Sequence, residues 1–328
     1  MRYPWQEDDW RRIVREFDSL PNAWLLTGPE GIGKVDFAYS LARALLCDTP
    51  LADGRGCGRC ESCRWLASGT HPDFRHLCPE AADEGKEEGG KSARKLSQIK
   101  IEAVREIIEF SQLTAHRHGR RVVLVDPAEK LNLAAANAIL KVLEEPPDNT
   151  VFLLVADRPQ RLLPTIRSRC RKFSLSRPSH EVALAWLKSQ GVAHAEAELA
   201  WHGGAPVFEH DEALYRLRAQ FLSALKTPTL VGVLAAAEEV DRHKLPLAQP
   251  LEWLAKWLAD IAAQRLAHRV RYHPDEADAV ALLARRANLA ALMRCQDALT
   301  RLVPFGQHTL NVRLQLEALL MEYLKVFA

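Results

Sequence analysis

Four cysteines in the first quarter of the chain have the spacing of a metal site. Cys47 is followed after nine residues by Cys57-x-x-Cys60-x-x-Cys63. Thiolates two residues apart in a tight turn can both reach one Zn²⁺ at about 2.3 Å, and four thiolates complete its tetrahedral shell. The pattern therefore predicts a structural zinc site with no open position for a substrate. Cys78 lies within chain reach and is the alternative to Cys47 as the fourth ligand.

A glycine-rich stretch, GPEGIGKV at residues 28–35, is typical of a phosphate-binding loop. In the pattern G-x-x-x-x-G-K, backbone N–H groups cradle phosphates and the lysine faces the β- and γ-phosphates. The residues that would do this are Gly28, Gly31, Gly33 and Lys34. The next position, where a hydroxyl would hold Mg²⁺, is Val35, which cannot coordinate a metal.

A second part of a nucleotide site is present at Asp126, which follows the apolar run RVVLV and could help to hold a metal. Pro127 follows it, at the position where many ATPases of this type carry Glu, and proline can neither activate nor orient a water. We therefore predict a degenerate nucleotide site that does not hydrolyse ATP. The favoured interpretation is a loop kept by packing, although its glycines and Lys34 could still bind a phosphate weakly.

The elements around these residues predict an α/β domain. Short apolar runs at Ala23–Thr27, Arg121–Val125 and Val151–Val155 have the composition of buried strands. Helical patterns cover residues 35–47 and 134–143, so strands and helices alternate along the chain. Such alternation indicates a parallel sheet that is covered on both faces.

After about Phe173 the chain is rich in Ala and Leu and is expected to be helical to its end. In this part Trp253 and Trp257 are spaced on one helix, which we interpret as packing and not as a ligand site. The 328 residues are 48% hydrophobic and 26% charged with a net charge of +2, which is typical of two or three globular domains. This charge demands no nucleic-acid partner.

The N-terminus lacks a secretion signal, and no apolar run is long enough to cross a membrane. We therefore expect a cytoplasmic protein. In that reducing compartment its seven cysteines are not expected to form disulfides.

Several strings together resemble one family. They are YPW at residues 3–5, GTHPD at 69–73 after the cysteines, NAILKVLEEPP at 137–147 and SRC at 168–170. The chain resembles the delta-prime subunits of bacterial DNA polymerase III clamp loaders, which belong to the AAA+ group. The resemblance covers essentially the whole chain and is strongest over residues 20–175.

The resemblance implies three domains. A RecA-like AAA+ domain would span residues 1–175, a small helical lid 176–210, and an all-α collar for oligomerisation 211–328. It also implies a hetero-pentameric ring with gamma or tau and delta subunits, which loads the sliding clamp onto primed DNA. In this family gamma or tau hydrolyses ATP, and delta-prime is a rigid partner.

The resemblance also assigns a role to Arg169, the arginine of SRC. In clamp loaders this arginine reaches across the interface to the ATP of the next subunit, as a trans arginine finger, and a guanidinium suits a γ-phosphate. The alternative is a local salt bridge. The AAA+ lid usually presents its own arginine in a string like G-S-x-R, which here reads Gly203-Gly204-Ala205-Pro206. This is a further departure from a working ATPase.

Three other interpretations stay open. An active gamma- or tau-type ATPase would bind and hydrolyse nucleotide as an isolated chain. A small-metabolite kinase would transfer phosphate from ATP, although nothing outside the glycine loop supports it. A DNA-binding surface could use the basic cluster at residues 116–121 (HRHGRR), although a solvated turn before a strand explains the cluster as well.

Overall fold

We analysed a computed structural model of the chain. It describes residues 3–17, 20–79, 98–112, 120–306 and 311–328. Residues 116–119 of the basic cluster therefore lie outside the described residues, whereas Arg121 is described and buried. The described chain divides into two compact units. The first is drawn from residues 1–83, 97–183 and 205–207, and the second from 184–204 and 208–328.

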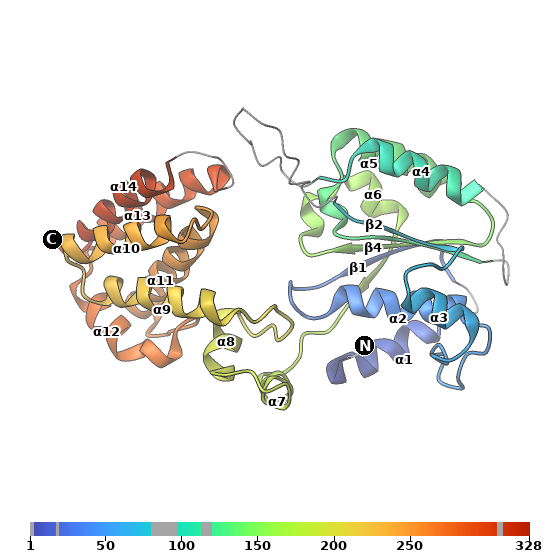
Figure 1. The fold of residues 1–328 in the computed structure, drawn as a ribbon, viewed down its shortest axis with the longest axis horizontal. Coiled ribbons are helices and arrows are strands. Elements are labelled where there is room, and N and C mark those ends of the chain that lie inside the picture. Colours follow the sequence, from blue (N-terminus) through green and yellow to red (C-terminus); the bar gives the residue numbers. More distant parts are fainter. Residues whose placement is uncertain (1–2, 18–19, 80–97, 113–119, 307–310) are drawn as a thin grey trace. The chain divides into compact units, whose positions relative to one another are not determined.

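The first unit is built on a five-stranded parallel sheet (Figure 1). Its strands are β1 (Ala23–Thr27), β2 (Phe74–Leu77), β3 (Arg121–Val125), β4 (Thr150–Ala156) and β5 (Arg171–Ser174). The order across the sheet is β2-β3-β4-β1-β5, which puts the strand before the glycine loop between two neighbours. Trp24 of β1 lies opposite Leu153 of β4 on one side and opposite Arg171 of β5 on the other.

Helices cover both faces of this sheet, as the fully apolar strands require. They are α1 (Glu7–Val14), α2 (Lys34–Leu46), α3 (Glu61–Ala67), α4 (Ile101–Gln112), α5 (Leu133–Glu144) and α6 (Pro164–Arg169). Successive residues of a strand point to opposite faces. Trp24 and Leu26 accordingly pack in one core with α1–α3, while Leu25 packs in another with α4–α6. The helix groups lie on opposite sides of the sheet in Figure 1.

The described part of the second unit contains helices and no strands. They are α8 (Ala195–Trp201), α9 (Glu212–Lys226), α10 (Leu230–Arg242), α11 (Ala248–Ala267), α12 (Ala277–Arg286), α13 (Leu289–Leu302) and α14 (Val312–Leu324), and α7 (His180–Ser189) lies at the boundary between the units. Trp253 and Trp257 are buried in its core, and Trp257 Nε1 donates a hydrogen bond to Tyr323 Oη at 3.0 Å. The tryptophan pair therefore packs, as expected.

The predicted fold class, a RecA-like α/β domain followed by helical domains, is confirmed. Two strands differ from the sequence analysis. No strand is predicted at Phe74–Leu77, and the predicted helical part begins at about Phe173, which lies inside β5. Both are edge strands with exposed residues, so their strand conformation depends on pairing within the sheet. The three-domain division at 175 and 210 stays a prediction.

Candidate functional site

The glycine loop connects the end of β1 to the start of α2. Gly31 and Gly33 have φ values of 74° and 81°, in the left-handed region that glycine adopts without strain. Gly33 is the N-cap residue of α2, so the free N–H groups of the first helical turn begin at Lys34. Locally, the loop therefore has the conformation that the sequence pattern requires.

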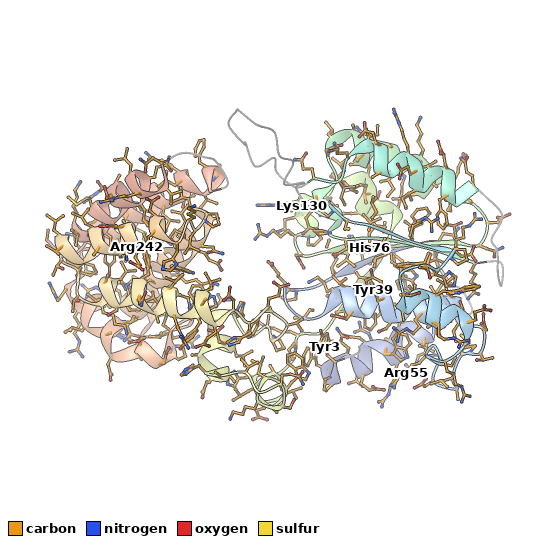
Figure 2. The ribbon with its side chains drawn as sticks, in the orientation of Figure 1. Tyr3, Tyr39, Arg55, His76, Lys130 and Arg242 are labelled. Atoms are coloured by element: carbon orange, nitrogen blue, oxygen red, sulfur yellow. The ribbon has the colours of Figure 1, made fainter. Side chains whose placement is uncertain are left out.

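The loop is packed between two other segments of the first unit. On one side Gln6 Nε2 donates to the carbonyl oxygens of Ile32 and Gly33 at 3.0 and 2.8 Å, and a Cβ on Gly33 would overlap the ring of Tyr3. Tyr3, labelled in Figure 2, comes from the segment just before α1. On the other side the N–H of Val207 donates to Gly31 O at 2.9 Å. Packing therefore constrains both glycines.

Lys34 is satisfied within its own chain. Its side chain is only 3% exposed, Nζ donates to Pro29 O at 2.5 Å, and the ammonium group forms an ion pair with Asp157. Asp157 directly follows β4 at the carboxyl edge of the sheet. The charge of the lysine is therefore already paired with a carboxylate of the same chain.

The surroundings of Lys34 are also acidic. Burial, together with the negative charges of Asp157 and Glu129, raises the pKa of Asp126 to about 6, although Lys34 acts in the opposite direction. Glu129 Oε1 accepts hydrogen bonds from the N–H groups of Asp157 and Arg158 at 3.0 and 2.9 Å. Asp157 pairs with the Lys34 ammonium group, and Asp126 and Glu129 add negative charge nearby, which disfavours a further anion such as a nucleotide phosphate.

The positions that differ from the phosphate-loop pattern have structural roles. Val35 packs its apolar side chain against the core that α2 shares with the sheet. Pro127 is the N-cap residue of a short 3₁₀ helix over Ala128–Lys130. Neither residue can supply a hydroxyl or a carboxylate to a metal or to a water.

Arg169 is the last residue of α6 and contacts its own chain at two points. Nη1 donates to Thr165 O at 3.1 Å, and the guanidinium forms an ion pair with Glu144, the last residue of α5. The arginine side chain is 33% exposed. Cys170 next to it is buried, and burial raises the pKa of its thiol to about 12, which makes it an unreactive apolar side chain.

Arg169 is not part of the same cluster as Lys34 and Asp126. Within the described residues its hydrogen-bond and ion-pair partners come only from α5 and α6. The two sets of predicted site residues thus belong to two separate places on the first unit. This separation suits an arginine that acts on another chain.

The structure brings four cysteines together at the end of α2 and the start of α3. The sulfur atoms of Cys47, Cys57, Cys60 and Cys63 all lie within 4.8 Å of one another. The Cys47 and Cys60 sulfurs are 3.8 Å apart, and a tetrahedron with Zn–S bonds of about 2.3 Å has edges of about 3.8 Å. The donor set and its size therefore fit a metal ion with four thiolate ligands. Cys78 is exposed and belongs to no metal-ligand cluster within the described ranges.

The four cysteine side chains have different electrostatic environments. The Thr49 hydroxyl and nearby N–H groups lower the pKa of the Cys57 thiol to about 5, whereas burial raises the pKa of Cys47 and Cys63. Four adjacent thiolates need a cation to balance their charge, and a coordinated thiol loses its proton. Cys60 also caps α3, because its sulfur accepts from the N–H of Cys63.

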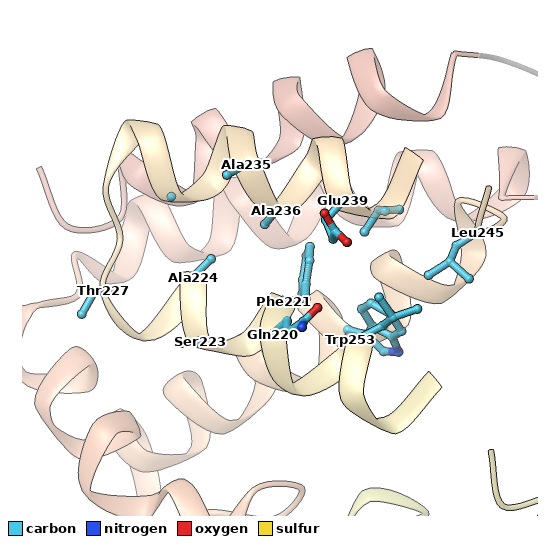
Figure 3. Close-up of a pocket in the computed structure, with 13 residues that line it drawn as sticks. Gln220, Phe221, Ser223, Ala224, Thr227, Ala235, Ala236, Glu239, Leu245 and Trp253 are labelled. Atoms are coloured by element: carbon cyan, nitrogen blue, oxygen red, sulfur yellow. The ribbon is translucent and has the colours of Figure 1, made fainter. Parts of the chain in front are cut away.

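A hollow of about 490 Å³ in the second unit lies between α9, α10 and the start of α11 (Figure 3). Phe221, Ala236 and Trp253 contribute apolar surface, and Glu239 is the one charged residue among the described residues that line it. Elsewhere in this unit Asp260 is fully buried and accepts from the N–H groups of residues 271–273 and from His273 Nδ1. The Asp260 carboxylate therefore holds residues 271–273 against α11.

Asp157 and Glu144 are the site residues that sequence reasoning missed. Asp157 had a signal, because it lies two residues after the end of a predicted buried strand, close to where Asp126 lies after its own strand. Glu144 lies inside the NAILKVLEEPP string, but its pairing with Arg169 is visible only in three dimensions.

Two family models match the chain. "DNA polymerase III, delta subunit" matches residues 6–179, and "DNA polymerase III, delta subunit, C terminal" matches residues 212–324. Among curated proteins, DNA polymerase III subunit delta' of Pseudomonas aeruginosa is 34% identical, and the match covers 98% of this chain and 97% of that protein. The Escherichia coli subunit delta' is 33% identical over 90% of this chain and 86% of its own length. The Escherichia coli subunit tau is 34% identical but covers 48% of this chain and 22% of tau.

Proposed function

Since the chain belongs to the family of DNA polymerase III delta' subunits, we propose that it is a non-hydrolysing subunit of the clamp loader. It joins gamma or tau and delta subunits in a hetero-pentameric ring, which loads the sliding clamp onto primed DNA in the cytoplasm. Its own contribution to ATP hydrolysis is Arg169, offered to the ATP of a neighbouring subunit. No helix within the described ranges has the length and apolar character of a membrane span.

The observation that carries the non-hydrolysing role is the ion pair between Lys34 and Asp157. A phosphate-loop lysine must be free to face the β- and γ-phosphates, yet here it is buried and neutralised by a carboxylate of its own chain. Val35 and Pro127 remove the metal-binding and water-orienting groups as well. Pro206, at the position of the lid arginine, is a further missing part.

The trans role of Arg169 is supported by its exposure and by its separation from the degenerate site. During hydrolysis a water attacks the γ-phosphorus, and the bond to the β–γ bridging oxygen breaks as ADP leaves. A guanidinium stays protonated throughout and stabilises the charge on the transferring phosphoryl group. In other phosphoryl-transfer systems such an arginine contributes about 10³–10⁵ in rate.

The four-cysteine cluster is proposed to hold a structural zinc. With all four positions taken by thiolates, the ion would fix the turn between α2 and α3 and would have no site for substrate. This role agrees with the position of the cluster, which involves neither Lys34 nor Arg169.

The test uses the isolated chain and the reconstituted complex. The isolated chain is expected to hydrolyse no ATP and to bind a fluorescent ATP analogue far more weakly than the tau subunit does. In the complex, Arg169→Ala is expected to remove the share of ATPase activity that comes from the one site facing this chain, and to slow clamp loading. Hydrolysis by the isolated chain would favour the gamma- or tau-type alternative, and full activity of the Arg169→Ala complex would refute the trans arginine.

A further inference from the structure

Glu144 lies where a helix does not favour an acid. It is the last residue of α5, and Glu145 follows as the C-cap residue. The carboxyl end of a helix carries partial negative charge, so cations are favoured there and carboxylates are not. A residue that breaks such a local rule usually serves a purpose outside its own helix.

The partner of Glu144 outside its helix is Arg169. Their side chains form an ion pair, with Glu144 48% and Arg169 33% exposed. The Thr165 carbonyl holds the guanidinium at a second point, through Nη1 at 3.1 Å. A guanidinium carries five N–H groups, so two anchors leave three N–H groups for another acceptor.

The backbone that carries Arg169 is also fixed. Ile166 of α6 is fully buried, and Cys170 is 7% exposed in the same core. The helix is therefore anchored just before and just after the arginine. The long side chain is the remaining source of freedom, and Glu144 and Thr165 together restrain it.

We infer that Glu144 is a positioning residue for Arg169, which holds the guanidinium ready for the γ-phosphate of the neighbouring subunit. The inference rests on the proposed trans role of Arg169. A side chain that is fixed before the reaction loses less entropy in the transition state than a free one, so hydrolysis is faster. Because Glu144 is half-exposed, solvent screens its repulsion of the phosphate.

The opposite reading is that Glu144 masks the arginine and keeps it from the phosphate. Positioning predicts slower hydrolysis when the carboxylate is removed, whereas masking predicts faster hydrolysis. The sign of the change therefore separates the two.

The experiment compares reconstituted clamp-loader complexes that contain wild-type chain, Arg169→Ala, Glu144→Gln, or both substitutions. The Arg169-dependent ATPase is the wild-type rate minus the Arg169→Ala rate. We expect Glu144→Gln to lower the kcat of this part about fivefold, equivalent to about 1 kcal/mol, with the KM for ATP unchanged. On the Arg169→Ala background the second substitution is expected to have no effect.

Glu145→Gln is the matched control, since Glu145 is the adjacent exposed acid and forms no ion pair within the described part of the chain. It should leave the rate unchanged, and gel filtration should show equal assembly of all complexes. Suppose that Arg169→Ala slows hydrolysis while Glu144→Gln leaves the rate unchanged or raises it. The positioning role of Glu144 is then overturned, and the arginine finger stands. If Arg169→Ala itself has no effect, the finger and the positioning role fall together.

Discussion

Removing the ion pair between Lys34 and Asp157 should change stability and leave clamp-loader activity intact. The substitutions are Lys34→Met, which keeps the apolar stem of the side chain, Asp157→Asn, which keeps its shape, and the two combined. If the lysine serves the fold and not a nucleotide, all three chains should support full ATPase activity and clamp loading in the reconstituted complex.

The size of the effect follows from the exposure of the two side chains. Exposed ion pairs contribute about 0–1 kcal/mol, and removing one partner of a buried pair costs about 3–5 kcal/mol. Lys34 is 3% and Asp157 29% exposed, so this pair lies between the two cases. We expect a coupling energy of about 2 kcal/mol between the substitutions, with the double variant more stable than the sum of the single effects predicts.

Hydrogen–deuterium exchange of the peptides that cover residues 23–46 measures this coupling energy in the part of the chain around Lys34. A local measurement is needed because a chain of two units need not unfold in one step. A coupling of about 2 kcal/mol corresponds to roughly a 30-fold difference in protection. Lys130→Met is the control, since Lys130 (labelled in Figure 2) is exposed and has no ion pair within the described residues. A coupling below about 0.5 kcal/mol, or loss of loader activity in Lys34→Met, would show that the lysine has another role.

Three more predictions concern the loop, the cysteines and the acid at the end of β3. Val35→Thr alone should give no ATP hydrolysis in a phosphate-release assay, because Pro127 still leaves no group to orient a water; turnover above background would contradict this. Wild-type chain purified without chelators should contain one zinc ion per chain by elemental analysis. The Cys57→Ser variant should contain no zinc, and the Cys78→Ser variant should still contain one. Wild-type chain without zinc would exclude the four-cysteine zinc site. Burial raises the pKa of Asp126 to about 6, so its penalty to folding begins near the ordinary carboxyl pKa of about 4, grows up to about pH 6 and is constant above that. Asp126→Asn should therefore stabilise the chain by about 1 kcal/mol at pH 8, after discounting for partial exposure, and by much less at pH 4 in urea titrations; equal effects at both pH values would refute the assignment.

The central strands of the sheet could be predicted from the sequence because their apolar composition indicates burial. β1, β3 and β4 are runs of apolar residues that are covered on both faces, and such runs are recognisable without a structure. β5 was not recognisable, because only Phe173 of its four residues is buried. Its conformation comes from hydrogen bonds to β1, which no local pattern encodes.

The same distinction applies to the candidate sites. The cysteine cluster could be predicted because its ligands are close in sequence, and the structure places their sulfurs together. Asp157 and Lys34 are far apart in the chain, so the lysine could not be recognised as neutralised. A missing group, such as the hydroxyl absent at Val35, can be recognised from the sequence alone. A carboxylate that neutralises the lysine from elsewhere in the chain, such as Asp157, can be recognised only once the fold is known.

The contact between Val207 and Gly31 affects how the first unit can be isolated. The chain leaves this unit after residue 183 and returns for residues 205–207, where Ala205 enters the core beside α2. A fragment cut at residue 183 would lose this return and leave the Gly31 carbonyl without its partner. A soluble fragment of the α/β unit should extend at least to residue 207, and folding of the unit cannot finish until that stretch has been synthesised.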